Sequence, residues 1–336
     1  MIIQINKISK LCATLCCTIV GVSCTQGDLM FRAENISQGH VVIRPDQTIH
    51  TLPGQKYYFY NTNGTTPYFS TPCDGIGNFK GTLPTGAYQV IAANSDTKGI
   101  AYRNMENYET ATAYATNLNK VRLTWSISEW TQKDVEWTAI EKTRSTERQT
   151  LGDLYSMTLE TLEVKPNDTI RHTPSPTLLT RTMRLNFTLD QELLTKVTAL
   201  SGVLQGVYPS VQLCSGKTIA SEIDRSPNLW TDYYGIQKED HWTVSINLFG
   251  ICDPQQGKIY ENVSKLTLIM DEQEVTIEVD LTKSLSNILE SYEGELPVEI
   301  PVQLNIELKL VDIGISGRVE SWSYIEPGGT EILIPM

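Results

Sequence analysis

Strict alternation of apolar and polar residues is the strongest pattern along this chain. In the segments 183–189, 275–281 and 302–310, every second residue is an aliphatic residue, Met or Phe, and the residues between them are polar or charged. A period of two with one polar face is typical of strands in an antiparallel sheet whose other face packs on a core. The pattern therefore predicts a chain built mainly from β-strands.

Shorter segments add further strands, and helical spacing is scarce. The other predicted strands are 40–44, 56–60, 87–93, 121–127, 157–164, 241–248, 265–270, 318–324 and 331–334. Turn residues such as Leu83-Pro84-Thr85-Gly86 separate them. Helical spacing is confined to Asp190–Leu200, where Asp190 is a candidate N-cap, and more weakly to Leu281–Ile288. Many short strands with such turns favour a sandwich or barrel over a parallel α/β sheet.

The first 23 residues have the organisation of a secretion signal. Lys7 and Lys10 precede the apolar run Leu11–Val22, which is too short to span a bilayer and suits the core of a signal peptide. The run ends in Gly21-Val22-Ser23-Cys24, which resembles a bacterial lipobox with Gly21 where Leu is usual. We expect Cys24 to be acylated and to anchor the chain in a membrane; an ordinary signal peptide cut nearby is the alternative.

Three prolines mark the predicted boundary between two domains. Pro166, Pro174 and Pro176 fall in one short segment, and proline disrupts both helices and central strands. Strong alternation resumes at Arg181. The predicted division is a signal peptide over 1–23, an N-terminal β-sandwich domain over 24–168 and a C-terminal β-sandwich domain over 169–336.

Composition excludes some classes of function. Hydrophobic residues make up 40% of the chain, which is enough for a core, and the formal net charge is −12. A chain this acidic lacks the cationic field that phosphate backbones need, so we expect no nucleic-acid partner. After the signal is removed, Cys73, Cys214 and Cys252 cannot all pair. A Cys214–Cys252 disulfide and small buried side chains both remain open.

No motif points to catalysis or to a metal. The four histidines, His40, His50, His172 and His241, have no metal-ligand spacing, and the sequence contains neither His-Glu-x-x-His nor Gly-x-Ser-x-Gly. No calcium-binding loop pattern is present either. We therefore predict a protein that is not an enzyme and that uses no cofactor and no metal.

Aromatic residues offer the only candidate binding surface outside assembly. Trp230, Tyr233 and Tyr234 fall in one predicted loop, and Trp322 shares a predicted strand face with Tyr324. Exposed aromatic faces can stack on sugars, whereas buried ones belong to a sandwich core. Trp230, Tyr233, Tyr234 and Trp322 are the candidate contacts with a glycan or a partner.

Several segments together resemble the Bacteroides-type fimbrillin superfamily, in particular its lipoprotein anchor and accessory subunits. Besides the lipobox, they are residues 56–64, the hairpin strand Leu83–Asn94 and the opening of the second domain, residues 179–187. The resemblance implies an all-β fold of two tandem transthyretin-like Greek-key β-sandwich domains. It also implies an outer-membrane lipoprotein at the cell surface or in the fimbrium. Its implied role is that of a structural, pilin-like anchor or accessory subunit, with other fimbrial subunits as partners and host or bacterial surface ligands in adhesion. A glycan-binding outer-membrane surface lipoprotein is the alternative.

The resemblance also implies assembly by β-strand addition. In the family, a protease cuts after an arginine that follows the first strand, and the vacated groove accepts a strand from a neighbour. Arg44 matches that position, but Pro45 disfavours cleavage there, and an uncut chain that keeps its lipid suits an anchor. Arg32 is an alternative cut that would shed the lipid.

Two more sites follow from the resemblance. The C-terminal segment with Ile332, Leu333 and Ile334 is a candidate donor strand, or else an edge strand that closes its own domain. Asp168-Thr169-Ile170 resembles the short O-glycosylation motif of these bacteria, so Thr169 is a candidate modification site.

Overall fold

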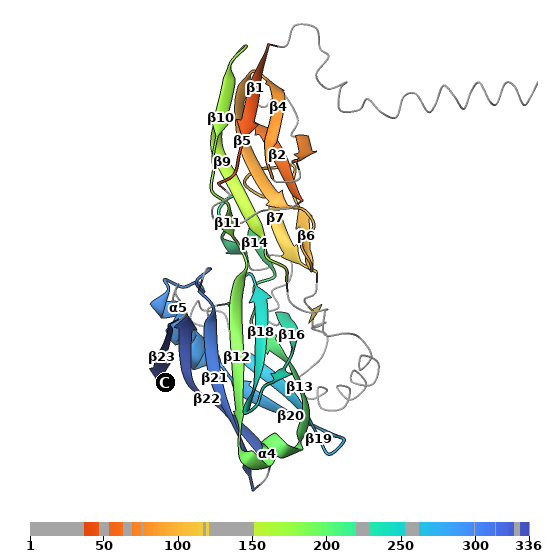
Figure 1. The fold of residues 1–336 in the computed structure, drawn as a ribbon, viewed down its shortest axis with the longest axis vertical. Coiled ribbons are helices and arrows are strands. Elements are labelled where there is room, and N and C mark those ends of the chain that lie inside the picture. Colours follow the sequence, from red (N-terminus) through yellow and green to blue (C-terminus); the bar gives the residue numbers. More distant parts are fainter. Residues whose placement is uncertain are drawn as a thin grey trace, which may run out of the picture.

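The computed structural model shows an elongated, all-β molecule with one sandwich at each end (Figure 1). It describes residues 37–46, 54–62, 69–74, 77–116, 119–120, 151–219, 229–252, 262–298, 300–312, 314–325 and 330–335. The predicted signal, Cys24 and the predicted strand 121–127 lie outside these residues. The predicted all-β sandwich fold is confirmed.

The first sandwich packs a three-stranded sheet on a five-stranded sheet. The smaller sheet has β1 (Gln38–Ile43) between β10 (Thr169–His172), which is parallel to it, and β4 (Phe79–Pro84), which is antiparallel. The larger sheet has the order β11 (Thr177–Leu178), β9 (Tyr155–Val164), β5 (Gly86–Asn94), β2 (Gln55–Asn61) and β3 (Phe69–Pro72). Val41 and Ile43 of β1 pack against Tyr57 and Phe59 of β2 in the core between the two sheets.

A third, four-stranded sheet covers the other face of the five-stranded sheet. Its order is β15 (Thr218–Ile219), β14 (Ser210–Gln212), β7 (Thr112–Ala115) and β6 (Ile100–Arg103). Tyr58 and Ile91 point to this side, where they share a core with Val211 and Phe249. Strands buried on both faces read as continuous apolar runs. This explains why β2 carries four aromatic residues in a row, all of them buried.

The second sandwich holds the strongly alternating segments. One sheet has the order β17 (Ile236–Gln237), β18 (His241–Leu248), β12 (Arg181–Leu189), β21 (Val302–Val311), β22 (Gly314–Ile325) and β23 (Glu331–Pro335). The other has the order β20 (Gln273–Asp280), β19 (Val263–Met270), β13 (Val197–Gln205), β16 (Leu229–Tyr234) and β8 (Asn119–Lys120). The apolar residues of β12, and those of β21 as far as Leu308, face the core between the sheets, as the alternation predicts. Leu310, which the alternation also assigns to the core face, is exposed near the end of β21.

Two helices accompany this sandwich, α4 (Gln191–Lys196) and α5 (Thr282–Ser291). Asp190 caps α4 as predicted, with Oδ1 accepting a hydrogen bond from the Leu193 N–H at 2.8 Å. The helix ends earlier than predicted, because Val197 and Leu200 belong to β13 and are buried in the core beside β19. Apolar residues three apart fit a helix, but long-range pairing decides their conformation.

Sheet membership differs from the predicted domain boundary at residue 168. β10 pairs with β1, and β11 pairs with β9, so residues 169–178 lie with the sheets of the first sandwich. The prolines flank these two short strands instead of interrupting them, since Pro166 precedes β10 while Pro174 and Pro176 separate it from β11. Apart from β8, the strands of the second sandwich begin with β12 at Arg181.

Candidate functional site

The first candidate site is the end of β1, where Arg44 follows a strand that is buried in the middle of its sheet. The Arg44 side chain is exposed. The backbone N–H of Arg44 donates a hydrogen bond to the His172 carbonyl oxygen at 2.9 Å. Two residues later the Asp46 N–H donates to the Pro174 carbonyl oxygen at 3.0 Å. The backbone therefore stays paired past the strand end. A protease that cuts after Arg44 has to open these contacts first, in addition to accepting the buried Pro45.

The C-terminal candidate, β23, pairs with β22 of its own sheet. It is the last strand of that sheet, and Ile334 lies opposite Trp322 while Ile332 lies opposite Tyr324. Leu333 points away and is 60% exposed. The strand closes its own sandwich, and in the part of the chain that the structure describes no other strand pairs with its outer edge. Such an edge can pair with another chain.

A polar contact holds the beginning of β23. The Glu331 carboxylate accepts hydrogen bonds from the Ser323 hydroxyl at 2.6 Å and from the Gln303 side-chain amide at 3.0 Å. Ser323 and Gln303 are buried on neighbouring strands. These bonds favour the register of β23 against β22 in which Ile332 and Ile334 lie beside Tyr324 and Trp322.

The predicted aromatic platform is wrong for two of its four residues. Tyr233 is buried, its ring stacks on Phe187 with centroids 6.3 Å apart, and its hydroxyl bonds to Ser264. Burial raises the pKa of the Tyr233 hydroxyl above its ordinary value. Trp322 is buried in the second sandwich. Both rings alternate inward along their strands, so the apolar core takes them and they offer no face to a sugar.

The other two aromatic candidates do not restore a platform. Tyr234 is 38% exposed because it follows Tyr233 in β16 and points to the opposite face. The Trp230 side chain lies outside the described residues. A stacking surface built from the four predicted residues is therefore absent from what the structure describes.

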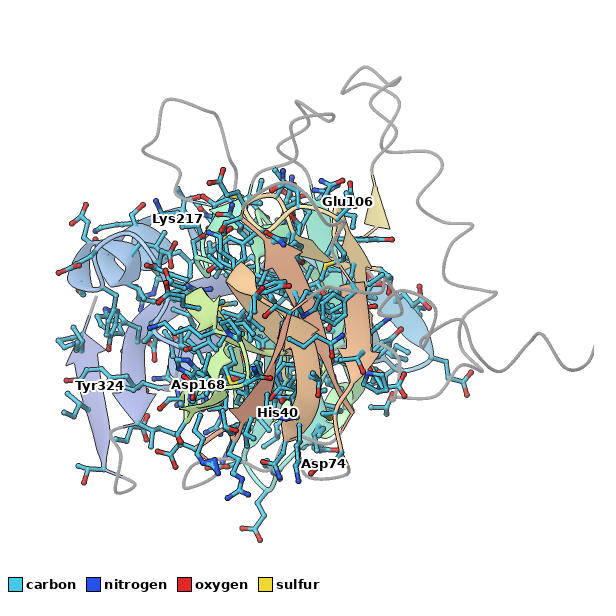
Figure 2. All side chains as sticks on the ribbon, turned by 90° about the horizontal axis from the view of Figure 1, so that it is seen from above. His40, Asp74, Glu106, Asp168, Lys217 and Tyr324 are labelled. Atoms are coloured by element: carbon cyan, nitrogen blue, oxygen red, sulfur yellow. The ribbon has the colours of Figure 1, made fainter. Side chains whose placement is uncertain are left out.

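Thr169, the candidate glycosylation site, is exposed at the tip of the first sandwich. It begins β10, directly after a tight turn in which Asn167 has φ 55°. The Asp168 carboxylate accepts a hydrogen bond from the Thr169 N–H at 2.7 Å, and the Asp168 carbonyl oxygen accepts one from the His40 N–H at 2.8 Å. Figure 2, a view from above, labels Asp168 and His40 close together at this end. The turn presents Thr169 to solvent.

The cysteines and acidic residues form no reactive centre in the described ranges. Cys73, Cys214 and Cys252 are not in disulfides, and burial raises the pKa of the Cys73 and Cys214 thiols. Among the described residues there is no group of three or more His, Cys, Asp and Glu side chains that could hold a metal ion. Within the same ranges, no helix has the length and apolar character needed to cross a membrane.

Sequence reasoning missed one buried charge, Arg181, where β12 begins. Its Nε donates to the Leu296 carbonyl oxygen at 2.7 Å, and its other nitrogens bond to the Phe249 carbonyl oxygen and to the Glu295 carboxylate. Burial lowers the pKa of the guanidinium, and the carboxylate of Glu295 opposes that shift. The signal was present in the sequence, because Arg181 shares the inward phase of Met183 in the alternating strand.

A family model described as "Domain of unknown function (DUF5119)" matches residues 23–225. The chain belongs to this family. The DUF5119 match begins beside Cys24, covers the whole first sandwich and ends after β15, the strand that completes the four-stranded sheet. No curated protein matches the sequence.

Solved structures share the fold of this DUF5119 member. One, described as "a putative adhesin" from Bacteroides ovatus, has 17% sequence identity and a TM-score of 0.53, and the match covers 83% of this chain and 91% of that chain. A second "putative adhesin" from the same species has 11% identity, a TM-score of 0.50, and coverage of 88% and 95%. The fimbrial anchor protein Mfa2 from Porphyromonas gingivalis has 12% identity, a TM-score of 0.48, and coverage of 88% and 98%. The first two of these structures show that the chain shares its fold with solved Bacteroides ovatus proteins.

Proposed function

We propose that this chain is a structural, non-enzymatic subunit of a cell-surface fimbria, an anchor or accessory subunit that is tethered to the outer membrane through Cys24. The observation that carries the proposal is the two-sandwich fold, which it shares over most of both chains with the B. ovatus structures described as adhesins. That similarity supports an adhesin-like or fimbrial accessory role at the cell envelope.

The proposed mode of assembly is β-strand addition. One feature of this chain supports it. β23 ends the sheet of the second sandwich with an exposed outer edge. Main-chain hydrogen bonds would supply the affinity and the alternate side chains would supply the register.

We further propose that β1 stays in place in this subunit. The buried Pro45 after Arg44 and the backbone bonds of Arg44 and Asp46 both oppose cleavage. An uncut chain would keep the acyl group of Cys24 and β1 together, which suits an anchor and not a polymerising shaft subunit.

The mass of the N-terminal region of native, membrane-extracted protein tests these proposals. Peptides from a non-tryptic digest would show the state of Cys24 and of the Arg44–Pro45 bond. We expect an acylated Cys24 and an intact bond, and the Arg44→Ala variant should give the same pattern apart from the substitution. An N-terminus at Pro45 would refute the anchor role, and an unmodified Cys24 would refute the lipid tether.

A further inference from the structure

A cavity of 560 Å³ opens in the second sandwich where β20 leads into α5, beside β22. Asp280, Lys283 and Ser284 line it from the β20–α5 side, and Arg318, Val319 and Glu320 line it from β22. Figure 1 shows α5 next to the sheet that contains β22, and α5 contacts β22. The volume lies within the range of about 300–1,000 Å³ that is typical of small-molecule sites.

The first turn of α5 presents hydrogen-bond donors at this cavity. The Asp280 carboxylate accepts a hydrogen bond from the Thr282 N–H at 2.9 Å. Among the described residues, the next two backbone N–H groups, those of Lys283 and Ser284, have no hydrogen-bond partner. The N-terminus of a helix attracts anions through such N–H groups and through the helix dipole.

The Ser284 side chain gives an independent sign of a ligand. Ser284 is 3% exposed and lines the cavity, yet its hydroxyl makes no hydrogen bond within the part of the chain that the structure describes. The Ser284 hydroxyl oxygen is not fully enclosed by protein atoms, so it opens onto the cavity. Its hydrogen-bond partner is therefore whatever occupies the cavity.

Charged groups of both signs complete the wall. Lys283 and Arg318 are exposed cations from two different elements. The nearest carboxylate oxygens to Arg318 Nη2 are those of Glu320 at 3.5 Å and Glu307 at 3.8 Å, longer than a strong charge-assisted bond. The guanidinium can therefore turn toward a ligand. Against these cations stand the carboxylates of Asp280 and Glu320, so the four charges that line the cavity cancel.

We propose that this cavity binds an acidic saccharide, with the carboxylate of one uronate residue at the N-terminus of α5. The backbone N–H groups of Lys283 and Ser284, the Ser284 hydroxyl and the two cations would bind the ligand carboxylate. The carboxylates of Asp280 and Glu320 would accept hydrogen bonds from sugar hydroxyl groups. Because the wall has no net charge, it suits a monoanion with several hydroxyls better than a phosphate dianion. The proposal does not depend on the fimbrial role, although the β22 residues that line the cavity directly precede Ser321, which pairs with Pro335 of β23.

Titration of the mature full-length protein with D-galacturonate tests the proposal, and D-galactose is the matched control that lacks only the carboxylate. Amide signals of Lys283 and Ser284 in a ¹⁵N TROSY spectrum should shift and saturate with galacturonate and stay in place with galactose at equal concentration. Sodium sulfate is the third arm. Absence of saturable galacturonate binding, equal binding of galactose, or sulfate binding as tight as that of galacturonate would overturn the assignment.

Variants locate the site. Ser284→Ala and Lys283→Gln should each weaken galacturonate binding about tenfold, as expected for the loss of one hydrogen bond to a charged group. Lys217→Gln changes an exposed lysine between β14 and β15 and should leave the affinity unchanged. Thermal unfolding verifies that all three variants fold; Lys283 is exposed, so its variant keeps the test valid if Ser284→Ala does not. Equal affinities for Lys217→Gln and Lys283→Gln would overturn the proposal.

Discussion

At the scale of single residues, the buried cation Arg181 makes contacts that join several elements. Arg181 places a guanidinium in the interior and satisfies two carbonyl oxygens there, those of Leu296 and Phe249. Removal of the cation would leave both acceptors buried without a donor, and such groups cost about 1–3 kcal/mol each. The charge therefore acts as a junction between β12, the end of β18 and the segment after α5.

We predict that Arg181→Met lowers the free energy of unfolding by about 3 kcal/mol. The loss follows from the two orphaned carbonyl oxygens, since Met nearly preserves the side-chain volume. Urea denaturation at neutral pH would measure it. Arg184→Met, on the outward face of the same strand, should change the stability by less than about 0.5 kcal/mol. Equal effects of the two variants would show that the Arg181 contacts are dispensable.

A second residue-scale prediction concerns Thr169. If the Asp168-Thr169-Ile170 turn is glycosylated, the peptide that contains Thr169 from native protein should carry a glycan mass that Thr169→Ala abolishes. Thr173 is also exposed on the same segment but does not follow an aspartate, so Thr173→Ala should keep the glycan. Mass spectrometry of both variants decides this, and an unmodified Thr169 in the native protein would remove the site from consideration.

At the scale of elements, a short side-chain contact joins α4 to the sheet beside it. Asp190 caps α4 through Oδ1, and its Oδ2 accepts a hydrogen bond from the Leu310 N–H of β21 at 2.8 Å. These backbone hydrogen bonds, first that of Leu193 and then that of Leu310, lower the pKa of the Asp190 carboxyl. One carboxylate thus connects a helix start to a strand that is far away in the sequence.

We predict that Asp190→Ala costs about 1–2 kcal/mol of stability at pH 7. Because the folded pKa is lowered, the contribution of the charge is complete above the unfolded pKa of about 3.9 and is lost as the pH falls through the folded value. The stability gap between wild type and variant should therefore shrink in acid. Urea denaturation at pH 7 and at lower pH would show it. Asp312→Ala, in an exposed hairpin turn, should change the stability at pH 7 by less than about 0.5 kcal/mol.

The elements that could be predicted from the sequence are the strands with one buried face and one solvent-exposed face. β12, β18 and β21 follow their alternation closely, because each residue either meets the core or meets water. The four-stranded sheet could not be predicted, because its strands have two to four residues and β7 pairs with β14 across about a hundred residues of sequence. The sequence leaves Tyr233 and Trp322 open between the surface and the core, because composition marks an aromatic residue but not the side to which its ring points.

At the scale of the whole molecule, the two halves share a core. Val211 and Phe249 come from the second half of the chain, yet they pack with Tyr58 and Ile91 of the first sandwich. The first sandwich is therefore incomplete without residues that lie beyond its own sequence. The extent of the family match, which continues to residue 225, agrees with this sharing.

We predict that Phe249→Ala destabilises the protein by about 3–5 kcal/mol and loosens the first sandwich as well as the junction. Hydrogen exchange of β5, read by mass spectrometry, should accelerate in this variant. Leu285→Ala removes an equally buried side chain from the second core and should leave the exchange of β5 unchanged. Unchanged exchange of β5 in Phe249→Ala would mean that the two halves are energetically separate.

The position of β1 also bears on mechanical strength. β1 enters the first sandwich at the tip furthest from the second sandwich and runs between two neighbours that pair with it along its length (Figure 1). A pull on the chain ahead of β1 would act along the strand, so its rows of backbone bonds would be sheared together and not peeled apart one by one. In a subunit that is tethered ahead of Gln38, tension would therefore load the hydrogen bonds of β1 in shear. Shear is the direction of loading in which a sheet resists rupture best.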